Sequence, residues 1–419
     1  NRQTKKIQGL IRSISMRSKP LTHRYLDPYF LHLPICYNSR LLQTFKWMMH
    51  SKVIASMMPF DNSEISGPTG SVWGINPDND SFIIIDRFDR SRYNNGNGVT
   101  FGGSGSGKTF ANMTEIDRNI VLGLVSRTVV IDPEGEFRFP YGQRIGFEVG
   151  GSYWTNPFHI ESVILDTDDE ENDGEIHAGK YMLRKTSDIV SWFKWVYPEM
   201  SAEESSIISR AVRKTFQDAG IVANTEVIPQ YYEHPTLSDF EKHIQNEPKL
   251  DVFRNVLEPY IHGEYASLFN GQTNWDLNNR LTVLDIKNLQ EGVRGPVYDL
   301  LLKYISEEFK KDREEPCALY MDEGHVMANP KNPQTLDFVV DCYKRFRKYS
   351  NYIELITQQV NDVLRMKDQA AQILANSTFK KYMYMKKSDA EALLQVENLS
   401  EKEIQFIMQR ERQGRGIVI

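Results

Sequence analysis

The feature that most constrains the fold is a glycine-rich segment, GGSGSGKT, at residues 102–109. It follows the short apolar-flanked stretch NGVTF and leads into FANMTEIDRNIVLGL, whose spacing predicts a helix. A strand, a glycine-rich turn, Lys-Thr and a helix in this order are typical of a phosphate-binding loop. Glycines let several backbone N–H groups converge on one phosphate, and the helix N-terminus adds partial positive charge.

Each position of this loop has a predicted role toward a nucleoside triphosphate, which we expect to be ATP. Lys108 is expected to reach the β- and γ-phosphates, and the Thr109 hydroxyl to ligate Mg²⁺. The residues predicted to contact the nucleotide are Gly102, Gly103, Ser104, Gly105, Ser106, Gly107, Lys108, Thr109 and Phe110. A chance Gly/Ser loop is the alternative, but strand, loop, Lys-Thr and helix all agree on the first interpretation.

A second motif, CALYMDEGH at residues 317–325, is a short apolar strand that ends in two carboxylates. We expect Asp322 to hold Mg²⁺ through water. Glu323 points the other way and is expected to polarise the attacking water. An acidic pair at a strand end is also often a helix N-cap, and alone the two interpretations are balanced. The upstream phosphate-binding loop favours the catalytic one.

Composition limits the class of protein. The chain has 419 residues and a net charge of −6, which is an ordinary soluble globular composition with room for more than one domain. It begins with Asn1 rather than Met, so we expect a fragment. No apolar run is long enough to span a bilayer, and three cysteines without metal-ligand spacing suit a reducing cytoplasm. The mild acidity argues against a surface that coats nucleic acid throughout, although a local basic channel stays possible.

Alternating strands and helices predict an α/β fold with a mostly parallel sheet. Strands are expected at 127–137, 280–289 and 351–359 and in CALYMDEGH, where Asp322 lies at the strand tip, with helices at 296–311 and 335–349. Two apolar runs around NPDND, within residues 70–88, predict an added β-hairpin.

The two nucleotide motifs are far apart in sequence: Lys108 and Asp322 are separated by 322 − 108 = 214 positions, so something is inserted between them. Helical spacing in this region predicts an inserted all-α subdomain, with Ser238 as an N-cap. The predicted domains are 1–64, the end of a preceding domain; 65–177, the first part of the NTPase core; 178–270, the helical subdomain; and 271–419, the second part of the core.

Several elements in order carry a family resemblance: GGSGSGKT, DPEGEF, NPF, the helical insert, MDEGH, KRFRK, ITQQ and GRG. Over about residues 65–419 the chain resembles the VirB4-type ATPases of conjugative type IV secretion systems. These belong to a wider class of hexameric RecA-like motors that includes HerA and FtsK. The resemblance implies a RecA-like P-loop NTPase core, ATP and Mg²⁺.

The resemblance also suggests further site residues. Gln358 or Gln359 would sense the γ-phosphate or the lytic water; two polar residues closing a strand are the alternative. Arg345 and Arg347 would reach the nucleotide of a neighbouring subunit. The alternative for the arginines is a solvated basic helix end.

Two weaker assignments follow from the same motifs. In DPEGEF, Glu134 or Glu136 is a second candidate for the catalytic base, although a solvated turn is the simpler interpretation and Glu323 is preferred. Arg412 and Arg415, beside Gly414, are candidates for lining the nucleotide base or a subunit interface.

These observations predict a cytoplasmic ATPase that forms a ring, expected to be hexameric, and is attached to the membrane through other secretion components at its inner face. DNA contact, if any, would be independent of sequence. One alternative is a DNA-pumping coupling protein or a HerA/FtsK-type translocase. Another is a nucleotide-binding scaffold that hydrolyses little, against which Glu323 argues. A small-molecule P-loop kinase suits neither the insert nor the arginine pair.

Overall fold

The computed structural model describes residues 2–13, 66–76, 79–160, 178–221, 233–324, 334–358, 368–394, 397–409 and 414–419. The chain divides into two compact units, Asn1–Ser63 and Glu64–Ile419. In the first unit the described part is helix α1 (Arg2–Ser13), and the rest of the predicted segment 1–64 lies outside the described residues. No helix in the described ranges has both the length and the apolar character needed to cross a membrane.

The second unit is built on an eight-stranded sheet with the order β10-β9-β3-β8-β7-β4-β6-β5. Every neighbouring pair in it is parallel except β9 and β10. Its strands are β3 (Gly98–Phe101), β4 (Arg127–Asp132), β5 (Gln143–Gly146), β6 (Leu281–Asp285), β7 (Cys317–Met321), β8 (Asn351–Thr357), β9 (Phe379–Met383) and β10 (Gly416–Val418). The predicted α/β fold with a mostly parallel sheet is confirmed.

Both faces of the sheet are covered, because parallel strands need crossover connections that lay helices on them. Side chains alternate between the faces: Ala318 and Tyr320 of β7 belong to the hydrophobic cluster under α5, whereas Leu319 belongs to the larger cluster on the other side. The covering helices are α5 (Lys108–Val121), α11 (Glu291–Lys310), α12 (Gln334–Arg345), α14 (Asp368–Ala375), α15 (Lys387–Leu393) and α16 (Glu401–Met408).

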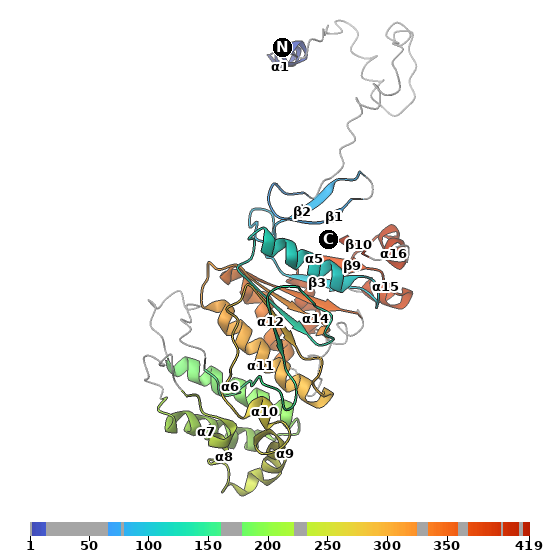
Figure 1. The fold of residues 1–419 in the computed structure, drawn as a ribbon. Coiled ribbons are helices and arrows are strands. Elements are labelled where there is room, and N and C mark those ends of the chain that lie inside the picture. Colours follow the sequence, from blue (N-terminus) through green and yellow to red (C-terminus); the bar gives the residue numbers. More distant parts are fainter. Residues whose placement is uncertain are drawn as a thin grey trace. The chain divides into compact units, whose positions relative to one another are not determined.

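The predicted β-hairpin is present as a separate two-stranded antiparallel sheet of β1 (Ser71–Ile75) and β2 (Phe82–Ile85). It lies beside α5 (Figure 1), and the Arg118 guanidinium of α5 donates to the backbone oxygen of Val72 in β1. The hairpin therefore covers the flank of the helix that follows the phosphate-binding loop.

The described residues of the predicted insert contain helices and no strands: α6 (Ala178–Val196), α7 (Ala202–Asp218), α8 (Leu237–Glu241), a 3₁₀ turn (Pro248–Leu250), α9 (Asp251–Ile261) and α10 (Ala266–Phe269). Helix α6 packs on α11, where the Trp192 indole donates to the carbonyl of Pro296 at 3.1 Å. The exact domain boundaries stay a prediction.

Five local predictions need correction. The strand predicted over 280–289 ends at Asp285, and the helix predicted over 296–311 begins at Glu291. The N-cap of α8 is Thr236 rather than Ser238, because the Asp239 carboxylate accepts from both the backbone and the hydroxyl of Thr236. The strand predicted over 127–137 ends at Asp132, where a tight turn begins. The helix predicted over 335–349 is α-helical only to Arg345 and continues as a 3₁₀ helix, Phe346–Tyr349.

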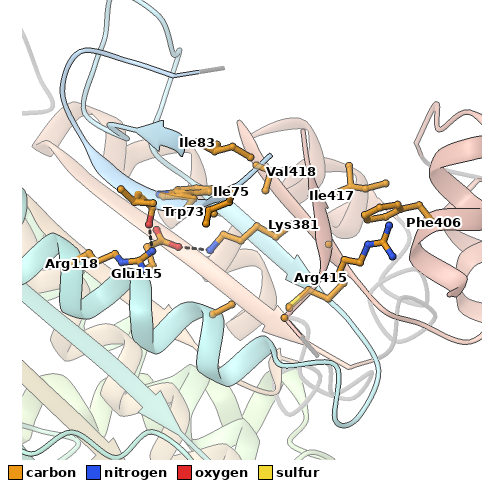
Figure 2. Close-up of a pocket in the computed structure, with 16 residues that line it drawn as sticks. Trp73, Ile75, Ile83, Glu115, Arg118, Lys381, Phe406, Arg415, Ile417 and Val418 are labelled. Atoms are coloured by element: carbon orange, nitrogen blue, oxygen red, sulfur yellow. Dashed lines mark hydrogen bonds and ion pairs between the residues drawn. The ribbon is translucent and has the colours of Figure 1, made fainter. Parts of the chain in front are cut away.

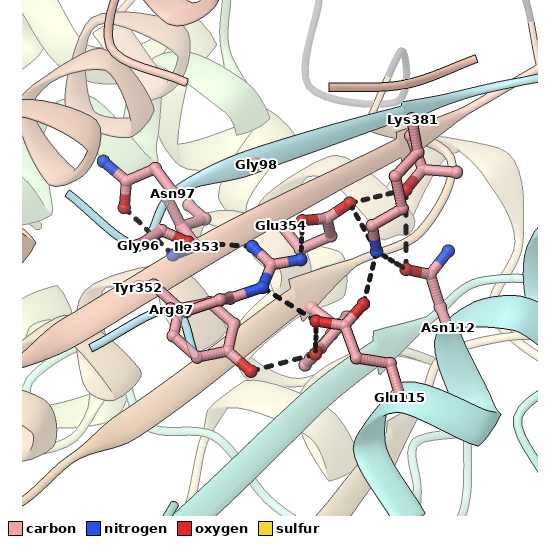
Figure 3. A network of polar contacts seen from close by, with 12 residues as sticks. Arg87, Gly96, Asn97, Gly98, Asn112, Glu115, Tyr352, Ile353, Glu354 and Lys381 are labelled. Carbon is pink, nitrogen blue, oxygen red and sulfur yellow. Dashed lines mark hydrogen bonds and ion pairs between the residues drawn. The ribbon is translucent and has the colours of Figure 1, made fainter. Parts of the chain in front are cut away.

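A buried polar network joins α5 to the strands beneath it (Figure 3). The Arg87 guanidinium, 3% exposed, donates to Glu115 at 2.7 Å and to Glu354 at 2.6 Å. Lys381 of β9 donates to Glu115 and lies 3.2 Å from Glu354. Burial opposes ionisation of Glu115, but the charges of Arg87 and Lys381 hold the pKa of its carboxyl below the ordinary value. Two cations and two carboxylates thus neutralise one another inside the fold.

Candidate active site

The glycine-rich loop joins the carboxyl end of β3 to the first turn of α5 and is fastened to two neighbouring strands. The backbone N–H of Gly102 donates to Thr357 at the end of β8 (3.3 Å), and that of Gly103 to Tyr384 just after β9 (2.8 Å). Gly107 begins the helix at φ 97°, and a Cβ there would lie 2.9 Å from the backbone nitrogen of Gly414. No side chain caps this helix, so its first N–H groups are left for an anion.

The side chains of the loop fit a phosphate ligand. Lys108 is buried, and its ammonium contacts the carbonyl of Gly103 at 3.4 Å. Burial lowers the pKa of Lys108, opposed by the negative charges of Glu323, Asp322 and Glu136. The hydroxyl of Ser106 is buried and has no hydrogen-bond partner among the described residues. Phosphate oxygens would satisfy such donors.

The two carboxylates of the second motif follow β7 directly and are both nearly buried. Burial, together with the charges of Glu323 and Asp132, raises the pKa of Asp322 to about 7. Glu323 adopts a left-handed backbone conformation, φ 49°, which a glutamate rarely takes and which is typical of functional sites. Its carboxylate accepts a hydrogen bond from the side-chain amide of Gln358, the first residue after β8.

The residues predicted to hold Mg²⁺, Thr109 and Asp322, supply the hard oxygen ligands that this ion prefers. The Thr109 hydroxyl donates to the Glu136 carboxylate at 2.6 Å. The described residues contain no group of three or more His, Cys, Asp or Glu arranged to hold a metal.

Asp132, at the end of β4, organises the turn that follows, a role the sequence analysis missed. Its buried carboxylate accepts from the backbone nitrogens of Gly135 at 2.8 Å, Glu136 at 3.1 Å and Phe137 at 2.9 Å. Both Glu134 and Glu136 are exposed, but the turn presents Glu136 to the phosphate-binding loop, where its carboxylate accepts from the Thr109 hydroxyl. An Asp before Pro-X-Gly is a signal for such a turn.

The other predicted positions are placed differently. Ser104 and Gly105 form the exposed tip of the loop, and the Phe110 side chain is 73% exposed. Gln359 and Arg412 lie outside the described residues. The Arg415 guanidinium lies over the ring of Phe406, 4.0 Å from its centroid.

Arg345 and Arg347 are exposed and precede β8, whereas Gln358 follows that strand. A strand of seven residues spans roughly 20 Å, so the arginines lie at the opposite edge of the sheet from the loop of their own chain. Arg345 pairs with Asp341 one helical turn earlier, at 2.9 Å. Neither arginine can belong to the phosphate site of the same subunit.

Comparison with known proteins gives a consistent result. Residues 82–415 match the family of TraG P-loop domains. The fold is similar to that of VirB4 from Thermoanaerobacter pseudethanolicus, with a TM-score of 0.74 and 23% identity over 85% of this chain and 95% of that one. It is also similar to a bacterial conjugative coupling protein, TrwBdeltaN70, in a form with sulphate, with a TM-score of 0.50 and 13% identity over 82% and 78% of the two chains. No curated protein matches the sequence.

Proposed function

The chain belongs to the TraG P-loop domain family, and on that premise we propose that it is a Mg²⁺-dependent ATPase that powers assembly or substrate transfer in a conjugative type IV secretion apparatus. The observation that carries the proposal is the meeting of Lys108, Asp322, Glu323 and Gln358 at one edge of the sheet. A site that only binds nucleotide has no need of a strained, nearly buried glutamate held by an amide.

Different residues of the site would bind the phosphates, activate the attacking water and hold the metal ion. Lys108 and the backbone N–H groups at the start of α5 hold the phosphates. Glu323 orients the attacking water and accepts its proton, and Gln358 fixes the direction of that carboxylate. Asp322 and Thr109 would hold Mg²⁺, which would supply positive charge to neutralise the phosphates.

The position of the two arginines supports a ring as the working form. Arg345 and Arg347 lie far from the phosphate loop of their own chain, but a neighbouring subunit could receive them as arginine fingers. We propose a hexameric ring that works in the cytoplasm and is held at the membrane by other secretion components. DNA, where it is contacted, would be bound through its phosphates without sequence specificity.

The test separates binding from chemistry. Lys108→Ala should abolish both ATP binding and turnover, because the phosphates lose their main cation. Glu323→Gln should retain ATP binding but lower turnover by about 10²-fold or more, the usual effect of losing a general base. Binding is measured calorimetrically and turnover by phosphate release.

The matched control is Glu258→Gln, which makes the same chemical change on an exposed face of α9 and should leave turnover unchanged. Normal turnover in Glu323→Gln would move the base role to another carboxylate, and Glu136→Gln then becomes the deciding variant. Turnover that persists in Lys108→Ala would refute the proposed site altogether.

A further inference from the structure

The segment 86–93, which follows the β1–β2 hairpin, brings a further arginine to the turn that carries Arg347. The Arg90 guanidinium donates to the backbone carbonyl of Arg347 at 3.3 Å. Arg347 lies in the 3₁₀ helix Phe346–Tyr349, and carbonyl groups in the last turn of a helix lack partners within that helix. Arg90 supplies such a partner, and a cation is a favoured group at a helix C-terminus.

Buried contacts on either side of Arg90 fix the segment that carries it. Earlier in the segment, the buried Arg87 donates to Glu354 of β8 at 2.6 Å, and its guanidinium lies 4.8 Å from the centroid of the Trp73 ring. After Arg90, the Asp89 carboxylate accepts from the backbone N–H of Ser91 at 3.0 Å, which closes a tight turn. The backbone of Arg90 is therefore held in place, although its side chain is exposed.

The hairpin that leads into this segment packs against the helix that follows the phosphate-binding loop. Arg118 of α5 donates to the Val72 carbonyl, and Trp73 lines a cavity of about 520 Å³ together with Glu115 of α5 (Figure 2). One stretch of chain, 71–93, thus contacts α5 at one end and the turn of Arg347 at the other.

Arg90 and Arg347 are like charges without a counter-charge: among the described residues, no carboxylate lies within ion-pair distance of either guanidinium. Arg345, in contrast, pairs with Asp341 at 2.9 Å. Partial burial and the charge of Arg347 lower the pKa of Arg90, so the two groups repel one another. An anion from outside the subunit would relieve this repulsion, and phosphate is an anion that guanidinium groups bind well.

We propose that Arg90 is a positioning residue for Arg347. It holds the turn that carries Arg347 and places a second guanidinium beside it, so that both charges face the phosphates of a nucleotide bound to a neighbouring subunit. The inference rests on the proposed function, since it adds a residue to the site that Arg347 would complete there. A phosphate of DNA is the competing ligand, and the test separates the two.

The test replaces Arg90 by methionine, which keeps an apolar stem but removes the donor and the charge. The kcat for ATP should fall by about tenfold, the scale of one hydrogen bond to a charged group. The KM for ATP and the melting temperature should stay unchanged, because the exposed Arg90 side chain contacts neither the phosphate-binding loop of its own subunit nor the core. Arg90→Lys restores the charge and should recover part of the rate.

Arg92→Met is the matched control, because it makes the same change in the same segment. Arg92 contacts the carbonyl of Ser66 at 3.1 Å and the carboxylate of Asp89, but not Arg347. This variant should keep full turnover.

Two further measurements distinguish positioning from a general effect on the fold. Lys108→Ala subunits retain Arg90 and Arg347, so mixing them with Arg90→Met subunits should restore part of the turnover. The double variant Arg90→Met/Arg347→Ala should be no slower than Arg347→Ala alone, since both changes remove the same contribution.

Unchanged turnover in Arg90→Met would overturn the inference, and so would a loss that mixing does not restore in rings that exchange subunits. Weaker DNA binding at full turnover would also overturn it and would assign the two arginines to DNA phosphates. The proposed function fails separately: Lys108→Ala would then keep turnover, whereas it stays inactive if only the role of Arg90 is wrong.

Discussion

Replacing Arg87 by methionine should destabilise the second unit strongly, because it removes one of two cations from a buried network of four charges. Glu115 and Glu354 would then share the single ammonium of Lys381. Removing one partner of a buried ion pair costs about 3–5 kcal/mol, since the remaining charge is left without compensation. Methionine fills much of the space of the arginine stem, so the main loss is electrostatic.

The expected shift in melting temperature follows from the size of the unit. Glu64–Ile419 contains 419 − 63 = 356 residues. At about 2.1 cal/mol/K per residue, its entropy of unfolding is roughly 0.75 kcal/mol/K, so the loss corresponds to a decrease of about 4–7 °C.

The pH dependence gives a second signature. In the unaltered chain the pKa of Glu115 is lowered, so its contribution to stability is present above the unfolded pKa and is lost as pH falls through the folded value. In Arg87→Met the crowded carboxylates favour uptake of a proton. If the pKa of Glu115 is raised in this variant, its contribution to the free energy of unfolding depends on pH in the opposite direction, and stability is lost as pH rises. The difference in free energy of unfolding between the unaltered chain and Arg87→Met should therefore increase from pH 5 to pH 8.

The assay is thermal and urea denaturation of the full chain, followed by near-ultraviolet circular dichroism. Arg92→Met is the control, because Arg92 is exposed and its ion pair with the half-buried Asp89 is long, 3.8 Å, so its loss should cost less than about 1 kcal/mol. The double variant Arg87→Met/Glu354→Gln restores charge balance and should recover part of the loss. A single variant within 1 °C of the unaltered chain at both pH values would refute the reasoning.

Two further predictions concern assembly and DNA. Arg345→Ala or Arg347→Ala should lower turnover with little change in ATP affinity. Mixing either variant with Lys108→Ala subunits should restore part of the ATPase activity. If activity does not recover in rings that exchange subunits, these arginines are only a solvated surface. DNA binding, measured by fluorescence anisotropy, should be independent of sequence and weaken steeply with salt, whereas a footprint at a defined sequence would contradict this.

The sequence by itself determined the nucleotide motifs and the class of fold. The stretches GGSGSGKT and MDEGH are each contiguous in the chain, so the roles predicted for them follow from local rules about glycine, helix ends and strand ends. The alternation of strands and helices was sufficient to predict a parallel sheet, because few other topologies are compatible with that order of elements. The family resemblance to VirB4-type ATPases was confirmed by the match over residues 82–415 and by the shared fold.

Tertiary structure decided which side chains meet. Parallel strands bring together residues that are distant in the chain, so the contact between Gln358 and Glu323 was visible only once the strands were ordered. The turn held by Asp132 placed Glu136 at Thr109, because a carboxylate bound to three successive N–H groups sets the direction of each residue after it.

The same limit applies to the buried network and the cavity. Arg87 and Glu354 are 267 positions apart, and the walls of the cavity come from the hairpin, α5 and the last strands of the chain. Hydrophobic periodicity indicates that one face of a helix or strand is buried, but it does not indicate which other element that face packs against. The packing partners of these residues are determined only when the sheet, the hairpin and the helix pack together.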